Sequence, residues 1–379
     1  MKGHFRKRGS TWSFAVSLGT DPETGKRRQI TRSGFKTKKE AEVACAEMIA
    51  QFERGELVIS KKQTLASYLE FWLENYAKTN LRQSTYTNHE IAVRSRLIPS
   101  LGHHELDKLT PLRVTKYLAE LQKEGLSADY IKYLHSVLSK ALNQAVKWQL
   151  VPKNIMEHVD PPRLIQKEIV TWTAEQANEF LSYAKDDKYY IAFVLAIYTG
   201  MRRGEILGLR WKDVDFEQSR ISVQQTLYRP ANSGIIFQEP KTKSAKRRIA
   251  IPQFVVKELK SHRAKQNALR IQYGAGYQDH DLVVCYDDGR PQDPRNLLRH
   301  YERIIKRSGL PYIRFHDLRH THATMLLQLG EHPKVVSERL GHSRVGITMD
   351  VYSHVLPDMQ KDAADNFEKM MKQKRSKSL

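Results

Sequence analysis

The segment "RFHDLRHTHATMLLQLG" (residues 314–330) joins a polar cluster to an apolar helix. Three histidines and an arginine fall within residues 316–322, and the segment ends in the core-like run "MLLQLG". His316 and Arg319 are three residues apart, so on a helix they project from the same side. A solvated helix face is the ordinary explanation for either residue alone. A functional explanation requires partners elsewhere in the chain.

The charge balance points to a polyanionic partner. The chain has 63 Lys and Arg against 42 Asp and Glu, a net charge of +21, and its pI is about 9.8. Such an excess favours partners whose phosphates it can neutralise with release of counterions. A membrane surface is less suitable, because no basic helix with a clean aromatic face is present in the sequence. Nucleic acid is therefore the expected partner.

Length and composition set the class of protein. At 379 residues, with 40% hydrophobic and 28% charged residues, the chain predicts two or three globular domains. Its longest apolar runs, such as "IAFVLAIY" (residues 191–198), are too short to span a membrane, and no signal-peptide pattern is present. Cys45 and Cys285 offer no disulfide framework and no zinc cluster. We therefore expect a protein of the reducing cytoplasm.

The N-terminus predicts a small basic sheet. Residues 1–39 hold eleven Lys or Arg and only two acids. Apolar and polar residues alternate in "STWSFAVSLGT" (10–20) and "RRQITRSGF" (27–35), on either side of a turn. A helix is expected near residues 37–55. A solubility tail is the alternative, but the hairpin pattern favours a folded DNA-binding module.

Two further regions follow. Residues 64–150 predict four or five helices, with Thr110-Pro111 as a helix start and with Trp and Tyr side chains in the core. A Pro-rich linker is expected around residues 152–168. Beyond it, a mixed region combines helices with strands in two segments, "SRISVQQTLY" (219–228) and "KRRIAIP" (246–252).

This mixed region contains five motifs that could act with the polar helix. They are "TGMRRGE" (199–205), the lysine-rich hairpin "KTKSAKRR" (241–248), "HDLRH" (316–320), "LGH" (340–342) and "DVYSH" (350–354), the last in a β-leaning run. Each has an ordinary explanation alone: an Arg–Glu pair that braces a helix, a solvated turn, or a packed tyrosine. Their order along the chain is specific.

That order resembles the tyrosine recombinase (phage integrase) family, and the likeness is greatest to integrases of Gram-positive temperate phages and conjugative elements. The resemblance implies a multidomain fold. It consists of a small N-terminal β-sheet plus helix that binds arm sites (1–60), an all-α core-binding domain with linker (61–165) and a mixed, mainly-α (α+β) catalytic domain with a C-terminal tail (166–379).

The resemblance also implies a site-specific recombinase that cleaves and rejoins DNA strands to integrate or excise a mobile element. Tyr352 is the implied nucleophile, which forms a 3′-phosphotyrosyl bond. Arg202 and Arg319 hold the oxygens of the scissile phosphate, because guanidinium is planar and bidentate. The spacing Thr-Gly-x-Arg-x-x-Glu selects Arg202 over its neighbour Arg203.

The remaining implied roles are acid–base roles. Lys243 protonates the leaving 5′-oxygen, with Lys241 as the open alternative, and His316 assists as general acid or base. His342 gives the phosphate a further donor. No cofactor and no metal are expected. His320, four residues after His316, could share a zinc ion with it, but no carboxylate or cysteine at matching spacing completes such a site.

The implied partners are double-stranded DNA, at core and arm attachment sites, and three further copies of the chain in a homo-tetramer on DNA. Excisionase and DNA-bending accessory proteins are further expected partners, and a membrane is not. The segment "LPDMQKDAADNFEKMM" (356–371) has a helical apolar face. It docks either on a neighbouring protomer or on its own domain.

Overall fold

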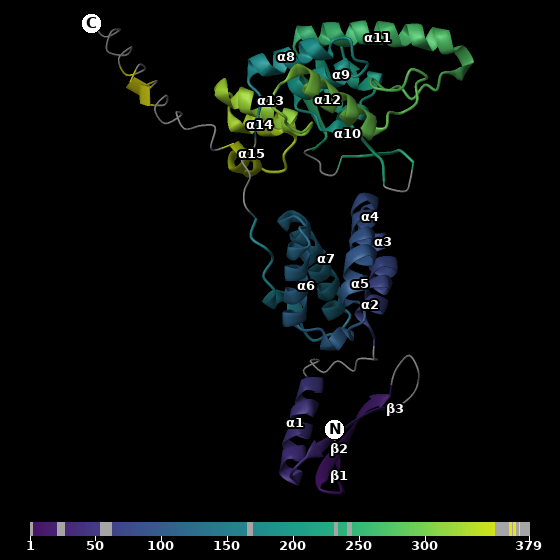
Figure 1. Ribbon diagram of the computed structural model, residues 1–379, viewed down its shortest axis with the longest axis vertical. Helices are drawn as coiled ribbons and strands as arrows, with labels where there is room; N and C mark the ends of the chain where they lie inside the picture. Colours follow the sequence, from purple (N-terminus) through teal and green to yellow (C-terminus); the bar gives the residue numbers. More distant parts are fainter. Residues whose placement is uncertain are drawn as a thin grey trace. The chain divides into compact units, whose positions relative to one another are not determined.

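The chain folds into two compact units, Met1–Gln166 and Lys167–Leu379 (Figure 1). The structure is a computed structural model, and it describes residues 3–20, 27–53, 63–164, 170–230, 234–240 and 245–352, with 364–365, 367–368 and 371. No helix in these ranges is long and apolar enough to cross a membrane.

The first unit begins with the sheet and helix that the sequence predicts. Three antiparallel strands, in the order β1-β2-β3, are followed by one helix: β1 (Gly3–Arg8), β2 (Thr11–Thr20), β3 (Arg27–Phe35) and α1 (Lys38–Glu53). Phe14 and Val16 are two residues apart on β2, so both face the same side of the sheet. They are buried with Cys45 and Met48 of α1. The alternating pattern thus gives this sheet one apolar face, which α1 covers.

The rest of the first unit is helical and has its own core. Its elements are α2 (Leu65–Trp72), η1 (Leu73–Ala77), α3 (Lys78–Asn80), α4 (Gln83–Ala92), η2 (Val93–Leu97), α5 (Ile98–Leu101), η3 (Leu106–Lys108), α6 (Pro111–Lys123), α7 (Ala128–Lys147) and η4 (Ile155–His158). Thr110 caps α6 by accepting a hydrogen bond from the Arg113 backbone N–H at 3.4 Å, and Pro111 occupies the first turn as predicted. Tyr68 and Trp72 are fully buried, which confirms their core role.

The second unit packs helices around small antiparallel sheets. Its elements are α8 (Ala174–Ala184), α9 (Tyr190–Thr199), α10 (Arg203–Leu207), η5 (Trp211–Asp213), β4 (Val214–Asp215), β5 (Arg220–Val223), β6 (Thr226–Tyr228), β7 (Ile236–Gln238), β8 (Arg247–Ala250), α11 (Gln253–Tyr273), η7 (Gly274–Gly276), α12 (Pro294–Ser308), α13 (Asp317–Gln328), α14 (Pro333–Leu340) and α15 (Val345–Tyr352). Helix α9 is buried along almost its whole length and packs against α8, α11 and α13. It is therefore the central element around which the site is built.

The β-leaning run before Tyr352 is the helix α15, which packs against α14, so tertiary packing outweighs its β-branched composition. Two local expectations were wrong. Strands β7 and β8, which flank the expected lysine hairpin, do not pair with each other, because β7 pairs with β6 and β8 pairs with β5. The expected linker is partly structured, since Met156 and Val159 are buried in the helical core.

Candidate active site

The site begins at the break between α9 and α10. Gly200 ends α9 in the left-handed conformation, with φ 62°, and Arg202 follows in an extended conformation as the N-cap of α10. A side chain at Gly200 would come within 2.7 Å of Leu340 and 2.8 Å of His322. Glycine is therefore required for both the turn and the close packing. The break places Arg202 between the two helices, as the N-cap of α10.

Arg202 is held by Glu205 on one side and is open on the other. Its Nη1 donates to Glu205 Oε1 at 2.8 Å, and its backbone N–H donates to Oε2 at 2.9 Å. The Arg202 side chain is 39% exposed, whereas that of Glu205 is only 5% exposed. The carboxylate thus fixes the guanidinium from the protein side, while part of the Arg202 side chain stays exposed to solvent.

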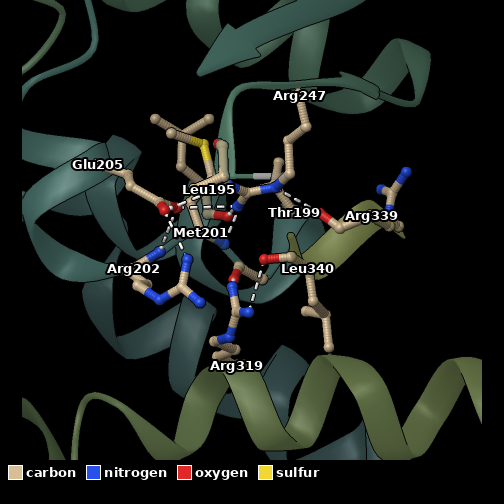
Figure 2. Close-up of polar contacts among 11 residues, drawn as sticks. Leu195, Thr199, Met201, Arg202, Glu205, Arg247, Arg319, Arg339 and Leu340 are labelled. Atoms are coloured by element: carbon tan, nitrogen blue, oxygen red, sulfur yellow. Dashed lines mark hydrogen bonds and ion pairs between the residues drawn. The ribbon is translucent and has the colours of Figure 1, made fainter. Parts of the chain in front are cut away.

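Glu205 has a second, fully buried arginine partner. Arg247 of β8 donates from Nη2 to Oε2 at 2.8 Å and from Nη1 to Oε1 at 3.2 Å (Figure 2). Burial alone would raise the pKa of Glu205. The hydrogen bonds and charge of Arg247, together with the charge of Arg202, have a larger and opposite effect, so the pKa of Glu205 lies below its usual range. One carboxylate therefore serves two guanidinium groups, and the cluster keeps a net positive charge.

Arg319 comes from α13 and lies across the same break. It is 3% exposed, and it donates to the carbonyl of Gly200 at 2.8 Å and to that of Leu340 at 2.6 Å. Figure 2 shows its guanidinium between the α9–α10 break and the end of α14. Both of these carbonyl acceptors are neutral, so these two bonds orient Arg319 without adding a counter-charge.

Two further predicted residues are histidines at helix ends. His316 is the N-cap residue of α13, and its ring centroid is 5.3 Å from that of His320. His342 follows Gly341, the left-handed cap of α14 with φ 71°. Its Nδ1 is 2.8 Å from the buried Thr348 hydroxyl of α15.

The charges of the two arginines act on both histidine rings. Desolvation, followed by the charges of His320, Arg319 and Arg202, lowers the pKa of His316 to about 4. Desolvation and the charges of Arg319 and Arg202 likewise lower the pKa of His342 to about 4. Both rings are therefore neutral near pH 7, in a positive field that favours a bound anion.

The structure describes the two remaining predicted residues only in part. Tyr352 is the last residue of α15, and its side chain lies outside the described residues. Lys243 and Lys241 fall within residues 241–244, also outside the described ranges. The segment that carries the lysines is flanked by an ion pair of 2.9 Å between Lys246 and Glu239.

Sequence reasoning missed the supporting residues Arg247 and Arg339. A signal existed for Arg247, because it occupies an inward position of β8 in register with buried Ile249; a charged residue there requires a buried partner. Arg339 gave no comparable signal. His322, which follows the polar cluster on α13, is buried and lies with Nδ1 2.9 Å from the Ile197 carbonyl.

The cluster brings together two arginines and two neutral histidines. Among the described residues, no three His, Cys, Asp or Glu side chains gather so as to hold a metal ion. A centre of this kind is suited to a phosphodiester, whose oxygens match the planar guanidinium donors.

Comparison with known proteins agrees with this chemistry. Residues 171–359 match the Phage integrase family, residues 4–52 match an arm DNA-binding domain, and residues 64–122 match the N-terminal SAM-like domain of phage integrases. A tyrosine recombinase XerC-like protein of Caldanaerobacter subterraneus subsp. tengcongensis is 31% identical, over 96% of this chain and 97% of that protein. The ICEBs1 integrase of Bacillus subtilis is 28% identical, over 94% and 96% respectively.

Solved structures share the fold. A Tn1549 transposon integrase in complex with transposon right end DNA matches with a TM-score of 0.70 and 24% identity, over 80% of this chain and 99% of that one. A lambda integrase dimer bound to a core site matches with a TM-score of 0.57 and 19% identity, over 92% and 93%. The chain belongs to the phage integrase family of tyrosine recombinases. It is a site-specific DNA recombinase of the kind encoded by mobile elements, and its partner is DNA.

Proposed function

We propose that the arginine and histidine cluster binds the scissile phosphate and that Tyr352 attacks it. The observation that carries this proposal is that Arg319 donates to the Gly200 carbonyl at 2.8 Å, two residues before Arg202. The neutral rings of His316 and His342 lie in the positive field of both arginines. Donors fixed in advance around a phosphate stabilise the charge that gathers on its oxygens in the transition state.

The proposed cleavage step is a transesterification. The Tyr352 hydroxyl oxygen forms a bond to phosphorus, and its proton passes to His316, which is neutral and therefore able to accept it. The bond from phosphorus to the 5′-oxygen breaks, and Lys243 gives that oxygen a proton. His342 donates to a phosphate oxygen. The products are a 3′-phosphotyrosyl bond and a free 5′-hydroxyl.

Strand exchange is the same step in reverse. A 5′-hydroxyl of another strand attacks the phosphotyrosine, Tyr352 leaves, and the phosphodiester is restored. The bond energy is kept in the protein–DNA link, so the scheme consumes no ATP. The two arginines supply the charge stabilisation, so it requires no metal ion.

The general acid can be identified with a modified leaving group. In a DNA substrate with sulfur in place of the scissile 5′-oxygen, the leaving group is a weakly basic thiolate, which needs no proton from an acid. We expect Lys243→Ala to cleave ordinary DNA at least about 100-fold more slowly and to regain its rate on the sulfur substrate. Lys241→Ala is the matched control and should cleave both substrates at the wild-type rate. The opposite pattern for the two lysines would transfer the role to Lys241.

We further propose three domains with separate DNA contacts. Residues 1–60 bind arm sites with strands in the major groove, whereas residues 61–165 and 166–379 bind the core site from opposite faces. A match to an arm DNA-binding domain supports the first assignment. Deletion of residues 1–60 should abolish arm-site binding and leave core-site cleavage intact. Equal loss of both would contradict a separate module.

The proposed assembly is a homo-tetramer on two duplexes. Support comes from a fold neighbour, lambda integrase, which has been solved as a tetramer bound to a Holliday junction. We place residues 356–371 on a neighbouring protomer, with docking on their own domain as the alternative. Excisionase and DNA-bending proteins complete the proposed complex on the nucleoid in the bacterial cytoplasm.

A further inference from the structure

Arg339 is a half-buried arginine that links α14 to the elements packed around the site. It lies near the end of α14, and its guanidinium donates to three different elements. Nη2 donates to the Tyr198 carbonyl of α9 at 2.9 Å, and Nη1 donates to the Ala250 carbonyl of β8 at 2.9 Å. Nε donates to the His322 Nε2 atom of α13 at 3.0 Å. This one side chain therefore fixes the end of α14 against three neighbours.

The backbone that Arg339 fixes is in turn an acceptor for two buried arginines. The Arg339 carbonyl accepts a hydrogen bond from Arg247 Nε at 2.7 Å. The next carbonyl, of Leu340, accepts one from Arg319 Nη2 at 2.6 Å. Figure 2 shows Arg247 and Arg319 reaching these two successive residues from opposite sides. The turn to Gly341 and His342 follows directly. A shift of this backbone would therefore move Arg319 and His342 together.

We propose that Arg339 is a positioning residue that holds the Leu340 carbonyl in place and thereby aims the Arg319 guanidinium at the scissile phosphate. The inference rests on the proposed function, in which Arg319 is a phosphate ligand. Through its carbonyl Arg339 also meets Arg247, which clamps Glu205 and so fixes Arg202. Arg339 and Arg247 thus support Arg319 and Arg202, the two proposed phosphate ligands.

His322 accepts a hydrogen bond from Arg339 Nε and so orients the Arg339 guanidinium. Its Nδ1 faces the Ile197 carbonyl at 2.9 Å, so the ring carries its proton there. Its Nε2 is consequently an acceptor for the Arg339 guanidinium. Burial and the charge of Arg339 lower the pKa of His322 to about 3, which keeps the ring neutral and the acceptor available. Arg339 is thereby oriented by a ring that does not titrate near neutral pH.

Guanidinium geometry is essential to this role. Arginine reaches three acceptors in fixed, diverging directions, whereas a lysine ammonium at the same position is a point charge on a flexible stem. If Arg339 acted only by its positive charge near the DNA, Lys would replace it. If Arg339 instead orients the backbone, Arg339→Lys should lose activity as Arg339→Met does.

The test compares two DNA substrates. One has an ordinary scissile phosphodiester, and the other has a neutral methylphosphonate. The methylphosphonate lacks the anionic oxygen that a correctly placed guanidinium would stabilise, so its cleavage depends less on the position of Arg319. At saturating DNA we expect Arg339→Met and Arg339→Lys to cleave the phosphodiester about 10- to 100-fold more slowly than the wild-type protein. We expect the same protein samples to cleave the methylphosphonate within about threefold of wild type. Because each sample supplies both rates, their ratio does not depend on the folded fraction.

The controls separate this inference from the proposed function. Arg290→Met removes an exposed guanidinium that pairs with Asp288 in a surface turn, and it should leave both rates unchanged. Arg319→Ala should show the same substrate dependence as Arg339→Met, but more strongly. Full phosphodiester cleavage by Arg319→Ala would overturn the proposed function itself. With Arg319 behaving as proposed, equal losses on both substrates, no loss for Arg339→Met, or rescue by Arg339→Lys would overturn the positioning role alone.

Discussion

Replacing Glu205 with glutamine should destabilise the catalytic unit because it leaves two arginines without their shared counter-charge. Glu205 accepts four hydrogen bonds: two from Arg202 at 2.8 and 2.9 Å and two from Arg247 at 3.2 and 2.8 Å. The amide is nearly the same size, but it replaces one oxygen with an N–H group that faces guanidinium donors. The change therefore removes a charge and introduces a donor–donor clash, without creating a cavity.

The magnitude follows from burial. The side chains of Glu205 and Arg247 are each 5% exposed, and breaking a buried pair by removing one partner costs about 3–5 kcal/mol. One oxygen of the amide still accepts, so we place the loss near the lower limit, at about 3 kcal/mol. A loss of that size reduces the equilibrium constant for folding by about 100-fold. Cleavage should fall as well, because Arg202 loses its orienting partner.

Hydrogen exchange measured by mass spectrometry gives the free energy of opening for peptides from α9 and α10. The matched control is Glu239→Gln, whose carboxylate is 78% exposed in its pair with Lys246 and whose loss should leave exchange unchanged. If Glu205→Gln exchanged no faster than the control, the carboxylate would not be the counter-charge that holds this centre together.

Three further predictions concern stability. Gly200→Ala should destabilise the catalytic unit by at least about 1–2 kcal/mol in urea denaturation, because φ is 62° and the added carbon would approach Leu340 and His322; an unchanged midpoint would contradict the packing at the break. His322 and His342 have lowered pKa values of about 3 and about 4, so they are neutral when folded, and unfolding takes up protons below about pH 6.5. Stability should therefore be full above pH 6.5 and fall with acidification towards pH 4, by up to about 1.4 kcal/mol per pH unit for each ring; urea midpoints should fall less steeply in His322→Gln, and equal slopes would refute this cause. Thr110→Ala should cost the helical unit about 1 kcal/mol through its lost N-cap bond, whereas an equal midpoint would show that the cap is replaced.

Local spacing predicts the backbone arrangement around these residues. His316 and Arg319 are three residues apart, and the structure places them at the N-cap and in the first turn of α13. Gly200 and Gly341 end α9 and α14 shortly before Arg202 and His342. Turn and cap chemistry acts between near neighbours, so a single sequence contains it. The same is true of the alternating strands of the N-terminal sheet.

The supporting network depends on contacts that the sequence does not specify. Arg247 meets Glu205 from 42 residues away, and Arg339 reaches Tyr198 across 141 residues. Such partners depend on how β8 and α14 pack around α9. The helix that ends at Tyr352 shows the same limitation, because its local composition favours a strand and its packing against α14 decides otherwise.

The central claim, a tyrosine nucleophile that needs no metal ion, is tested most directly with supercoiled plasmid carrying the cognate core site. The protein is mixed with the plasmid in EDTA and quenched with SDS, beside Tyr352→Phe. The account predicts relaxed topoisomers and DNA covalently joined to the wild-type protein, with both products absent for the variant. Relaxation and a covalent adduct retained by Tyr352→Phe, or wild-type activity abolished by EDTA, would contradict it.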